Sequence, residues 1–183
     1  MPLGPLVTPR VKTPDMPPPS TRPRPKPAPA DAGPTLDLDR YVPAFITFIA
    51  NKLSNSATAF YQRQFGVNVT EWRIMSLLAI EPGIPASRIC HVIGFDKGPV
   101  SRTLASLDKR GLVSIRTDPN DGRTHSIALT AKGRATHDKV IVAALERERR
   151  LLSCLGRDER EVLIDLIRRL HENLGAVTGG TGG

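Results

Sequence analysis

Residues 96–111, DKGPVSRTLASLDKRG, carry side chains whose types and spacing suit contact with DNA. On a helix, one face of this stretch would hold Gly98, Arg102, Ala105, Ser106 and Lys109. That face combines small residues, a hydroxyl and cations without an acid near its centre, whereas an ordinary solvated face mixes both signs of charge. Small residues permit close approach, and arginine can donate two parallel hydrogen bonds to a guanine edge. The stretch is therefore predicted to be a DNA-reading helix, with a plain solvated face as the alternative.

The ends of this helix are marked in the sequence. Asp96 is a favourable N-cap that also suits the positive end of the helix dipole, and Pro99 falls in the first turn. Gly111 stands where a C-terminal glycine is expected. The opposite face is apolar and should point into a core through Val100, Leu104 and Leu107.

Two short strands should follow the helix. Residues 112–117 and 124–130 alternate apolar and polar side chains, and the intervening DPNDG supplies turn residues. Arg123 then lies at the tip of a hairpin, where it could enter a minor groove, with Asp121 orienting its guanidinium. The alternative is a solvated turn arginine without a target.

Three further segments are helical by their apolar periodicity. Residues 37–65 form a long amphipathic helix that ends near Gly66, and Thr70 is expected to cap a mostly apolar helix at 70–80. EPGIP interrupts the chain before a short helix at 87–95, closed by Gly94. The fold class is therefore mainly α with a small β-hairpin wing, in the order of a winged helix-turn-helix domain.

At these residues the chain resembles the MarR family of bacterial transcriptional regulators. The resemblance rests on EWRIMSLLA, DKGPVSRTLASLDKRGLV and DPNDGRTHSIALTAKG, and it covers roughly residues 37–174. The specific wing pattern is Asp-x-Arg followed by Leu-Thr-x-x-Gly, here Asp121, Arg123, Leu129, Thr130 and Gly133. Many members carry Asp-Arg-Arg in the wing, whereas this chain has Gly122 in place of one cation. Helix geometry and resemblance together assign DNA contact to Ser87, Lys97, Gly98, Pro99, Ser101, Arg102, Thr103, Lys109, Asp121 and Arg123.

Long apolar stripes flank the reading unit. They comprise Val140, Ile141, Ala144, Leu145, Leu151, Leu152 and Leu155, then Val162, Leu163, Leu166, Ile167, Leu170 and Leu174. Together with the first helix they exceed what the small unit could cover, so a homodimer is predicted, although the stripes could also pack within one chain. The resemblance implies the same, since MarR-like proteins dimerise through their terminal helices. Two readers require a pseudo-palindromic operator on double-stranded DNA with half-sites about 34 Å apart.

Composition sets the expected domain limits. Residues 1–34 are rich in proline without hydrophobic periodicity, which is typical of a disordered basic tail. The winged-helix domain should occupy 35–175, with its DNA-binding core at 66–133 and dimerisation helices at 35–65 and 134–175, before a flexible tail at 176–183. The net charge of +8 favours an anionic partner such as nucleic acid over a membrane. The absence of a membrane-length or signal-like apolar run favours a cytoplasmic protein.

The resemblance also implies a small-molecule effector, often an aromatic acid, bound between the reader and the dimer helices. The EWR-type second helix is similar to that of regulators of aromatic-acid catabolism, some of which respond to CoA thioesters. One stripe of that helix, formed by Trp72, Ser76 and Ala79, is expected to face the first helix around Phe45, Phe48 and Asn51. An aromatic wall with the nearby cation Arg73 suits an aromatic anion. The expected ligand-binding residues are Phe45, Phe48, Asn51, Trp72, Arg73 and Ser76, with plain core packing as the alternative.

Enzyme motifs are missing from the sequence. There is no Walker-type loop, nucleophile elbow, H-E-x-x-H or metal-spaced His/Cys cluster, so neither an enzyme nor a cofactor or metal site is predicted. The four histidines are scattered, and Cys90 and Cys154 are expected to be small buried thiols. Two other functions stay open, a winged-helix protein interaction module and a thiol-based redox sensor. The resemblance weakens the second, because the family's redox sensors carry a cysteine near the start of the first helix, where this chain has none.

Overall fold

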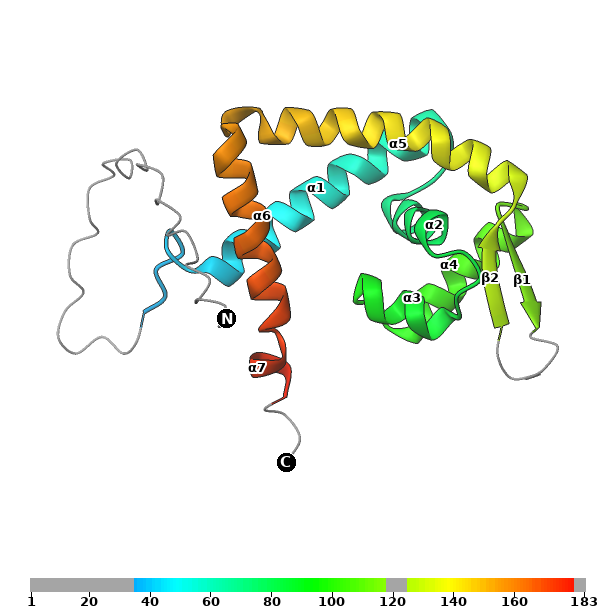
Figure 1. Cartoon of the computed structure of the whole chain (residues 1–183), viewed down its shortest axis with the longest axis horizontal. Coiled ribbons are helices and arrows are strands. Elements are labelled where there is room, and N and C mark those ends of the chain that lie inside the picture. The colour runs from blue at the N-terminus through cyan, green and yellow to red at the C-terminus, as the bar shows by residue number, and fades with distance from the viewer. Residues whose placement is uncertain (1–34, 118–124, 180–183) are drawn as a thin grey trace, which may run out of the picture. The chain divides into compact units, whose positions relative to one another are not determined.

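The central element of the structure is α2 (Val69–Ile80), which packs against four other helices and one strand. The structure is a computed structural model that describes residues 35–117 and 125–179. Most of the circumference of α2 is buried, as predicted from its apolar sequence, through Ile74, Met75, Leu77 and Leu78. In Figure 1, α2 lies between α5 above and the pair α3 and α4 below. The core is therefore built around one short helix that α1, α3, α4, α5 and β2 all contact.

The first helix, α1 (Val42–Phe65), begins five residues later than the sequence predicts. Pro43 stands in its first turn, where the missing N–H costs nothing. The proline ring would clash with the carbonyl four residues earlier, so the helix cannot extend back through Asp39. The C-terminal end is as predicted, since Gly66 takes the left-handed conformation with φ of 68°.

The cap of α2 corrects the sequence prediction. Asn68, rather than Thr70, is the N-cap, and its side chain accepts a hydrogen bond from the Glu71 backbone N–H at 2.9 Å. The Glu71 carboxylate in turn accepts one from the Asn68 backbone N–H at 2.9 Å. This reciprocal pair is a capping box formed by Asn-x-x-Glu, and it satisfies two N–H groups that would otherwise lack partners.

Helices α3 (Ala86–Ile93) and α4 (Lys97–Lys109) form the predicted pair. Gly94 between them has φ of 68° and Gly111 after α4 has φ of 67°, as both glycine assignments require. Asp96 occupies the N-cap position of α4 but makes no side-chain capping hydrogen bond. The inward face is confirmed, because the side chains predicted to point into the core are buried, namely Val100, Leu104 and Leu107.

The hairpin pairs β1 (Val113–Thr117) with β2 (His125–Leu129) in antiparallel register, Val113 opposite Leu129. An isolated antiparallel β-bridge, not expected from the sequence, joins Ile84 to Ile127 of β2. This bridge fixes the α2–α3 connection onto the wing. The turn with Asp121 and Arg123 lies outside the described residues, so its predicted contacts are not described.

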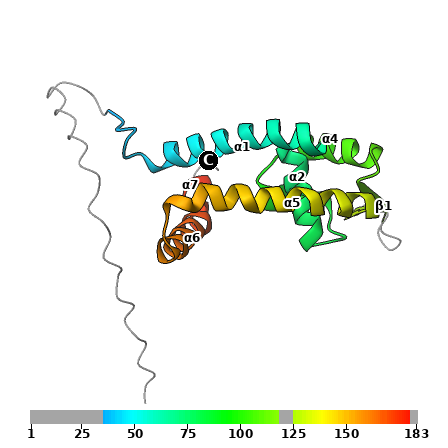
Figure 2. The ribbon, with the colours of Figure 1, turned by 90° about the horizontal axis from the view of Figure 1, so that it is seen from above.

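Helix α5 (Ala131–Leu151) begins shortly after β2, and its Gly133 lies close to the backbone of Leu112. A Cβ on Gly133 would collide with the carbonyl oxygen of Leu112. The Thr130 hydroxyl closes the junction, because it donates to the Gly111 carbonyl at 2.7 Å and accepts from the Gly133 N–H at 3.0 Å. From this junction α5 runs opposite in direction to α1 (Figures 1 and 2).

Residues Leu36–Leu151 form one compact unit, and the chain from Leu152 onward belongs to another. In the described part of the second unit, a 3₁₀ turn (Leu152–Cys154) precedes α6 (Arg157–Glu172) and α7 (Gly175–Thr178). Cys154 is exposed and Cys90 half-buried, so the expectation of two buried thiols is wrong. Across the described residues, no helix combines the length and apolar character that a membrane crossing requires.

Candidate DNA-binding surface

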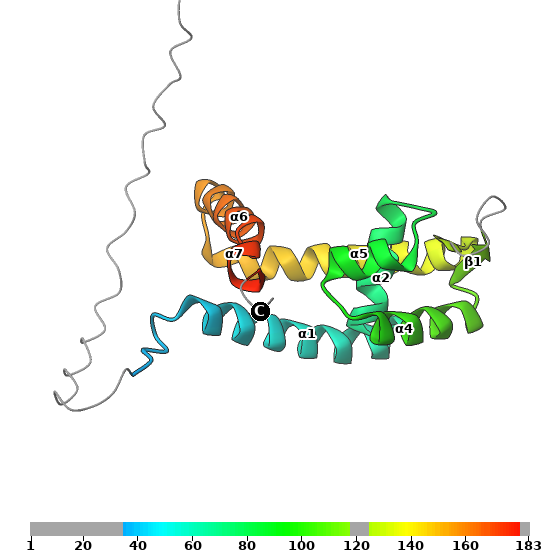
Figure 3. The same cartoon turned by 90° about the horizontal axis from the view of Figure 1, so that it is seen from below.

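The outward face of α4 carries most of the residues predicted to contact DNA. Six of them are exposed, namely Lys97, Gly98, Pro99, Ser101, Arg102 and Lys109. Figure 3, viewed from below, shows α4 in front of α2, on the side turned away from α5. Ser87 is exposed near the start of the neighbouring α3. The structure therefore presents these side chains on two adjacent helices, where a DNA duplex can reach them.

Arg102 is the cation best placed to read a base. Its guanidinium lies back along the helix, with Nη1 3.5 Å from where a Cβ of Gly98 would stand. No ion pair occupies Arg102 among the residues that the structure describes. An exposed guanidinium without a carboxylate partner keeps its donors available for a guanine O6 and N7.

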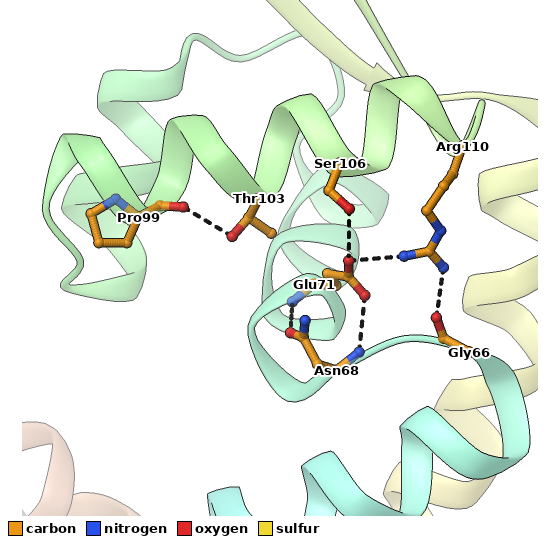
Figure 4. Close-up of polar contacts among 7 residues, drawn as sticks. All are labelled: Gly66, Asn68, Glu71, Pro99, Thr103, Ser106 and Arg110. Atoms are coloured by element: carbon orange, nitrogen blue, oxygen red, sulfur yellow. Dashed lines mark hydrogen bonds and ion pairs between the residues drawn. The ribbon is translucent and has the colours of Figure 1, made fainter.

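Two hydroxyls of α4 face other groups instead. The Thr103 hydroxyl donates to the Pro99 carbonyl at 2.9 Å, and this side chain is half-buried (Figure 4). Ser106 is exposed on α4, as predicted, and its hydroxyl also donates to Oε1 of Glu71 at 3.4 Å. Ser106 therefore lies at the edge of the outward face, where it also links α4 to α2.

Glu71 is the polar residue that holds α4 in place. Its carboxylate is buried and accepts from Nη1 of Arg110 at 2.8 Å, besides its bonds to Asn68 and Ser106 (Figure 4). Arg110 also donates through Nη2 to the Gly66 carbonyl at 2.6 Å. Glu71 and Arg110 together thus connect the start of α2, the end of α1 and the end of α4. Sequence reasoning missed this group, although the Asn-x-x-Glu spacing at 68–71 was a readable signal for its capping part.

Glu71→Gln should lower the free energy of unfolding by about 1–3 kcal/mol, the cost of leaving buried polar groups unsatisfied. The glutamine amide puts a donor where the carboxylate accepts only, so either Arg110 or the Asn68 N–H loses its acceptor. Urea denaturation followed by far-UV circular dichroism measures the change. Glu161→Gln, at an exposed acid of α6, is the control and should match the wild type. An unchanged unfolding midpoint for Glu71→Gln would contradict this role.

An ion pair fixes α3 to the end of α2. Arg88 donates through Nε and Nη2 to the two carboxylate oxygens of Glu81, both at 2.9 Å. These hydrogen bonds hold the pKa of Glu81 below its ordinary value. Both side chains are partly exposed, so the pair orients α3 more than it stabilises the fold.

The predicted effector residues are only partly brought together. Trp72 stacks on His137 at 5.2 Å between ring centroids and packs edge-on against Tyr61 at 6.1 Å. It does not reach Phe45 or Phe48, which lie about 20 Å or more further toward the N-terminal end of α1, at roughly 1.5 Å of rise per residue. The expected contact of Trp72 with Phe45 and Phe48 is therefore not found within one chain, because Trp72 packs against the C-terminal end of α1 at Tyr61.

Arg73 and Ser76 sit beside Trp72 on α2. Nη2 of Arg73 donates to the Ser54 hydroxyl of α1 at 2.9 Å, and the guanidinium lies 5.8 Å from the centroid of the Phe95 ring. Ser76 donates to the Trp72 carbonyl at 2.9 Å, so its hydroxyl serves the helix. No carboxylate pairs with Arg73 among residues 35–117 and 125–179.

Arg147 of α5 contacts two aromatic side chains of α1. Its guanidinium lies 5.7 Å and 5.8 Å from the ring centroids of Phe60 and Tyr61, and it donates to Ser56 at 2.8 Å. Burial raises the pKa of the Tyr61 phenol, and the charge of Arg147 opposes part of that rise. Tyr61 therefore stays neutral at physiological pH and acts as a packing residue between α1, α2 and α5.

Helices α2 to α4 followed by the β1–β2 hairpin, with a cationic outward face on α4, define a winged helix-turn-helix protein. Residues 65–124 match the model of the MarR family. A MarR/EmrR family transcriptional regulator from Acinetobacter sp. ADP1 has a similar solved structure, with a TM-score of 0.73 and 31% identity over 77% of this chain and 99% of that one. The chain belongs to the MarR family of DNA-binding transcriptional regulators.

Curated relatives agree with this assignment. The HTH-type transcriptional regulator YdgJ of Bacillus subtilis (strain 168) is 29% identical over 112 residues, which cover 60% of this chain and 66% of YdgJ. The transcriptional regulator HosA of Escherichia coli O111:H- is 27% identical over 124 residues, which cover 65% of this chain and 89% of HosA. Both relatives carry the regulator designation that the fold indicates.

Proposed function

We propose that this protein is a repressor that binds a pseudo-palindromic operator as a homodimer and is released by a small aromatic effector. The observation that carries the proposal is the outward face of α4, where Arg102 and Lys97 are exposed between small residues. Such a face fits a major groove, because small residues let the helix approach and cations contact phosphates and base edges. Ser87, Ser101, Thr103 and Lys109 complete the proposed contacts of α3 and α4.

Exposed apolar side chains support the homodimer. On α1 they are Val42, Phe45, Ile46, Phe48, Ile49 and Leu53, and on α6 Val162, Ile164, Leu166, Ile167 and Leu170. A soluble monomer rarely exposes so many large apolar side chains in continuous stripes, since covering them releases free energy. A second copy of the chain is the proposed cover, and its reading helix provides the second half-site contact.

The effector is proposed to be an aromatic acid or its CoA thioester, as in regulators of aromatic-acid catabolism. Arg73 supplies a half-buried cation, and the Phe95 and Trp72 rings supply aromatic surface near it. A carboxylate that pairs with Arg73 would compete with its hydrogen bond to Ser54 and so act on the α1–α2 contact. Ser76, Phe45, Phe48 and Asn51 remain proposed members of this site.

Salt dependence of DNA affinity tests this proposal against a protein interaction module. Operator DNA obtained by selection from a random library is titrated with protein at several salt concentrations, with fluorescence anisotropy as the readout. Phosphate contacts predict a steep fall of the logarithm of affinity with the logarithm of salt concentration, by about 0.9 for each contact. A DNA affinity that is undetectable, or that does not respond to salt, would favour the interaction module.

The wing contact is tested by Arg123→Ala. If Arg123 enters a minor groove, as proposed with Asp121 orienting it, its removal should weaken DNA binding and lower the salt slope by about one unit. Base preference in the major groove should stay the same, since α4 reads it. If Arg123→Ala kept the wild-type DNA affinity and salt slope, the wing would be a solvated hairpin without a DNA contact.

A further inference from the structure

Asp96 stands immediately before the reading helix α4 and carries a carboxylate that does not cap the helix. It holds the N-cap position with φ of −65° and ψ of 156°, yet its side chain makes no capping hydrogen bond. An N-cap side chain accepts from the backbone N–H two or three residues further on. The third residue here is Pro99, which has no N–H, so that the N–H of Gly98 is the one capping donor left, and the Asp96 side chain does not accept from it.

The carboxylate of Asp96 also lacks a cationic partner. No ion pair involves it within residues 35–117 and 125–179, although Lys97 is its neighbour in the chain. The side chain is exposed. Since an ionised carboxylate accepts hydrogen bonds and donates none, its lone pairs are available to a donor of a bound partner.

The backbone on both sides of Asp96 is firmly held. Phe95 is half-buried against the core, with the Arg73 guanidinium 5.8 Å from its ring centroid, and its N–H donates to the Cys90 carbonyl at 3.2 Å. The Asp96 carbonyl accepts from the Val100 N–H of α4 at 3.3 Å. The carboxylate therefore projects from a fixed point, and little conformational freedom is lost when it binds.

The guanidinium of Arg102 lies toward the same end of α4. Its Nη1 is 3.5 Å from where a Cβ of Gly98 would stand, and Gly98 follows Asp96 by two residues. In helix-turn-helix proteins the N-terminal residues of the reading helix contact base edges. The structure thus presents an acceptor and a bidentate donor at the end of α4 that suits base contact.

These two groups suit different bases. In the major groove, guanine offers the acceptors O6 and N7 to arginine, whereas cytosine N4 and adenine N6 are the amine donors that a carboxylate can use. Adenine holds the acceptor N7 beside N6 and so repels a carboxylate, which makes cytosine the better partner of Asp96. Guanine and thymine would place an acceptor oxygen against the carboxylate and desolvate it without a donor. Asp96 would therefore reject wrong bases as well as bind the right one.

We propose that Asp96 is a specificity-determining residue, whose carboxylate accepts a hydrogen bond from N4 of a cytosine close to the guanine that Arg102 contacts. This inference rests on the proposed function, because it requires α4 to lie in a major groove of the operator. The phosphates of any DNA repel this carboxylate. A sequence without the cytosine keeps that repulsion and lacks the hydrogen bond.

Asp96→Asn tests the contact with almost no change in shape. Asparagine is as favourable an N-cap as aspartate, so the thermal unfolding midpoint should stay at its wild-type value. The asparagine amide offers a donor beside an acceptor, which fits N7 and N6 of adenine. Selection from a random DNA library should therefore return the wild-type site except at one symmetric pair of positions, where adenine replaces cytosine.

Fluorescence anisotropy on single-base operator variants measures the size of this preference. The wild type should favour cytosine over adenine at that pair by about tenfold, and Asp96→Asn should lose or reverse the preference. Asp96→Ser, which also caps but has no carboxylate, should lose it as well. Asp108→Asn is the matched control, because it removes the same charge from an exposed aspartate near the other end of α4 and should keep the wild-type preference.

Two results would overturn the proposal. One is a wild-type base preference for Asp96→Asn at every operator position. The other is tighter binding of Asp96→Asn to all sequences by one common factor, because the carboxylate would then only repel phosphates. Selection by the wild type separates this inference from the proposed function. If the wild type enriches a pseudo-palindrome that Asp96→Asn reproduces, the function stands and the inference fails, whereas both fail if the wild type enriches no sequence.

Discussion

Arg102→Ala is expected to lower operator affinity and to relax base preference at one symmetric pair of operator positions. A bidentate arginine–guanine contact supplies about 1–3 kcal/mol of discrimination, and a dimer makes it twice. The side chain is exposed on α4 and packs on nothing in the core, so the fold and its thermal stability should not change. The measurement is operator affinity by fluorescence anisotropy against a panel of single-base variants.

Arg63→Ala is the control for this variant. Arg63 is an exposed cation in the last turn of α1, outside the proposed surface, and its removal changes net charge by the same amount. It should retain wild-type base preference with at most a slight change in affinity. If Arg102→Ala bound its operator with wild-type affinity and preference, the placement of α4 in the major groove would be wrong.

Ile167→Asp is expected to convert the proposed dimer into a monomer and to reduce operator affinity by at least about a hundredfold. Ile167 is 56% exposed on α6, so an aspartate costs little in an isolated chain. In a covered interface the same carboxylate would be desolvated without a partner, at a cost of several kcal/mol. A monomer also loses the second half-site, and with it the base contacts of one reading helix.

Sedimentation velocity at micromolar concentration measures the oligomeric state, and circular dichroism checks that the helices remain. Ile80→Asp is the matched control, because Ile80 is 78% exposed at the end of α2 and away from the proposed interface. The control should stay dimeric. Ile167→Asp that sediments like the wild-type protein would exclude this face of α6 from the dimer interface.

Local signals in the sequence were sufficient to predict α4 and the hairpin. Gly94 and Gly111 bracket the helix, and the four- and three-residue spacings of Val100, Leu104 and Leu107 predict which face is buried. These signals depend on residues within about one helical turn of one another, and the tertiary packing agrees with them. The residues of α4 that are not on the buried face form its outward face, which is why most of the predicted DNA contacts on α4 are exposed in the structure.

Contacts between distant segments could not be predicted in this way. The pair Glu71–Arg110 joins residues 39 positions apart, and nothing in either local sequence selects the other. The crossing point of α2 on α1 is also a tertiary property, because the apolar stripe of α1 continues over its whole length. Trp72 was therefore assigned to the wrong part of α1, and the actual neighbours of its ring are Tyr61 and His137.

Selection of DNA from a randomised library by the full-length protein tests the central claim most directly. A homodimer that reads through α4 should enrich a pseudo-palindrome whose half-site centres lie one helical turn apart, about 10–10.5 base pairs or 34 Å. Enrichment should be lost when the same selection is run with Ile167→Asp. Failure to enrich any sequence, or enrichment of a single motif without an inverted repeat, would contradict the account of a dimeric operator-binding repressor.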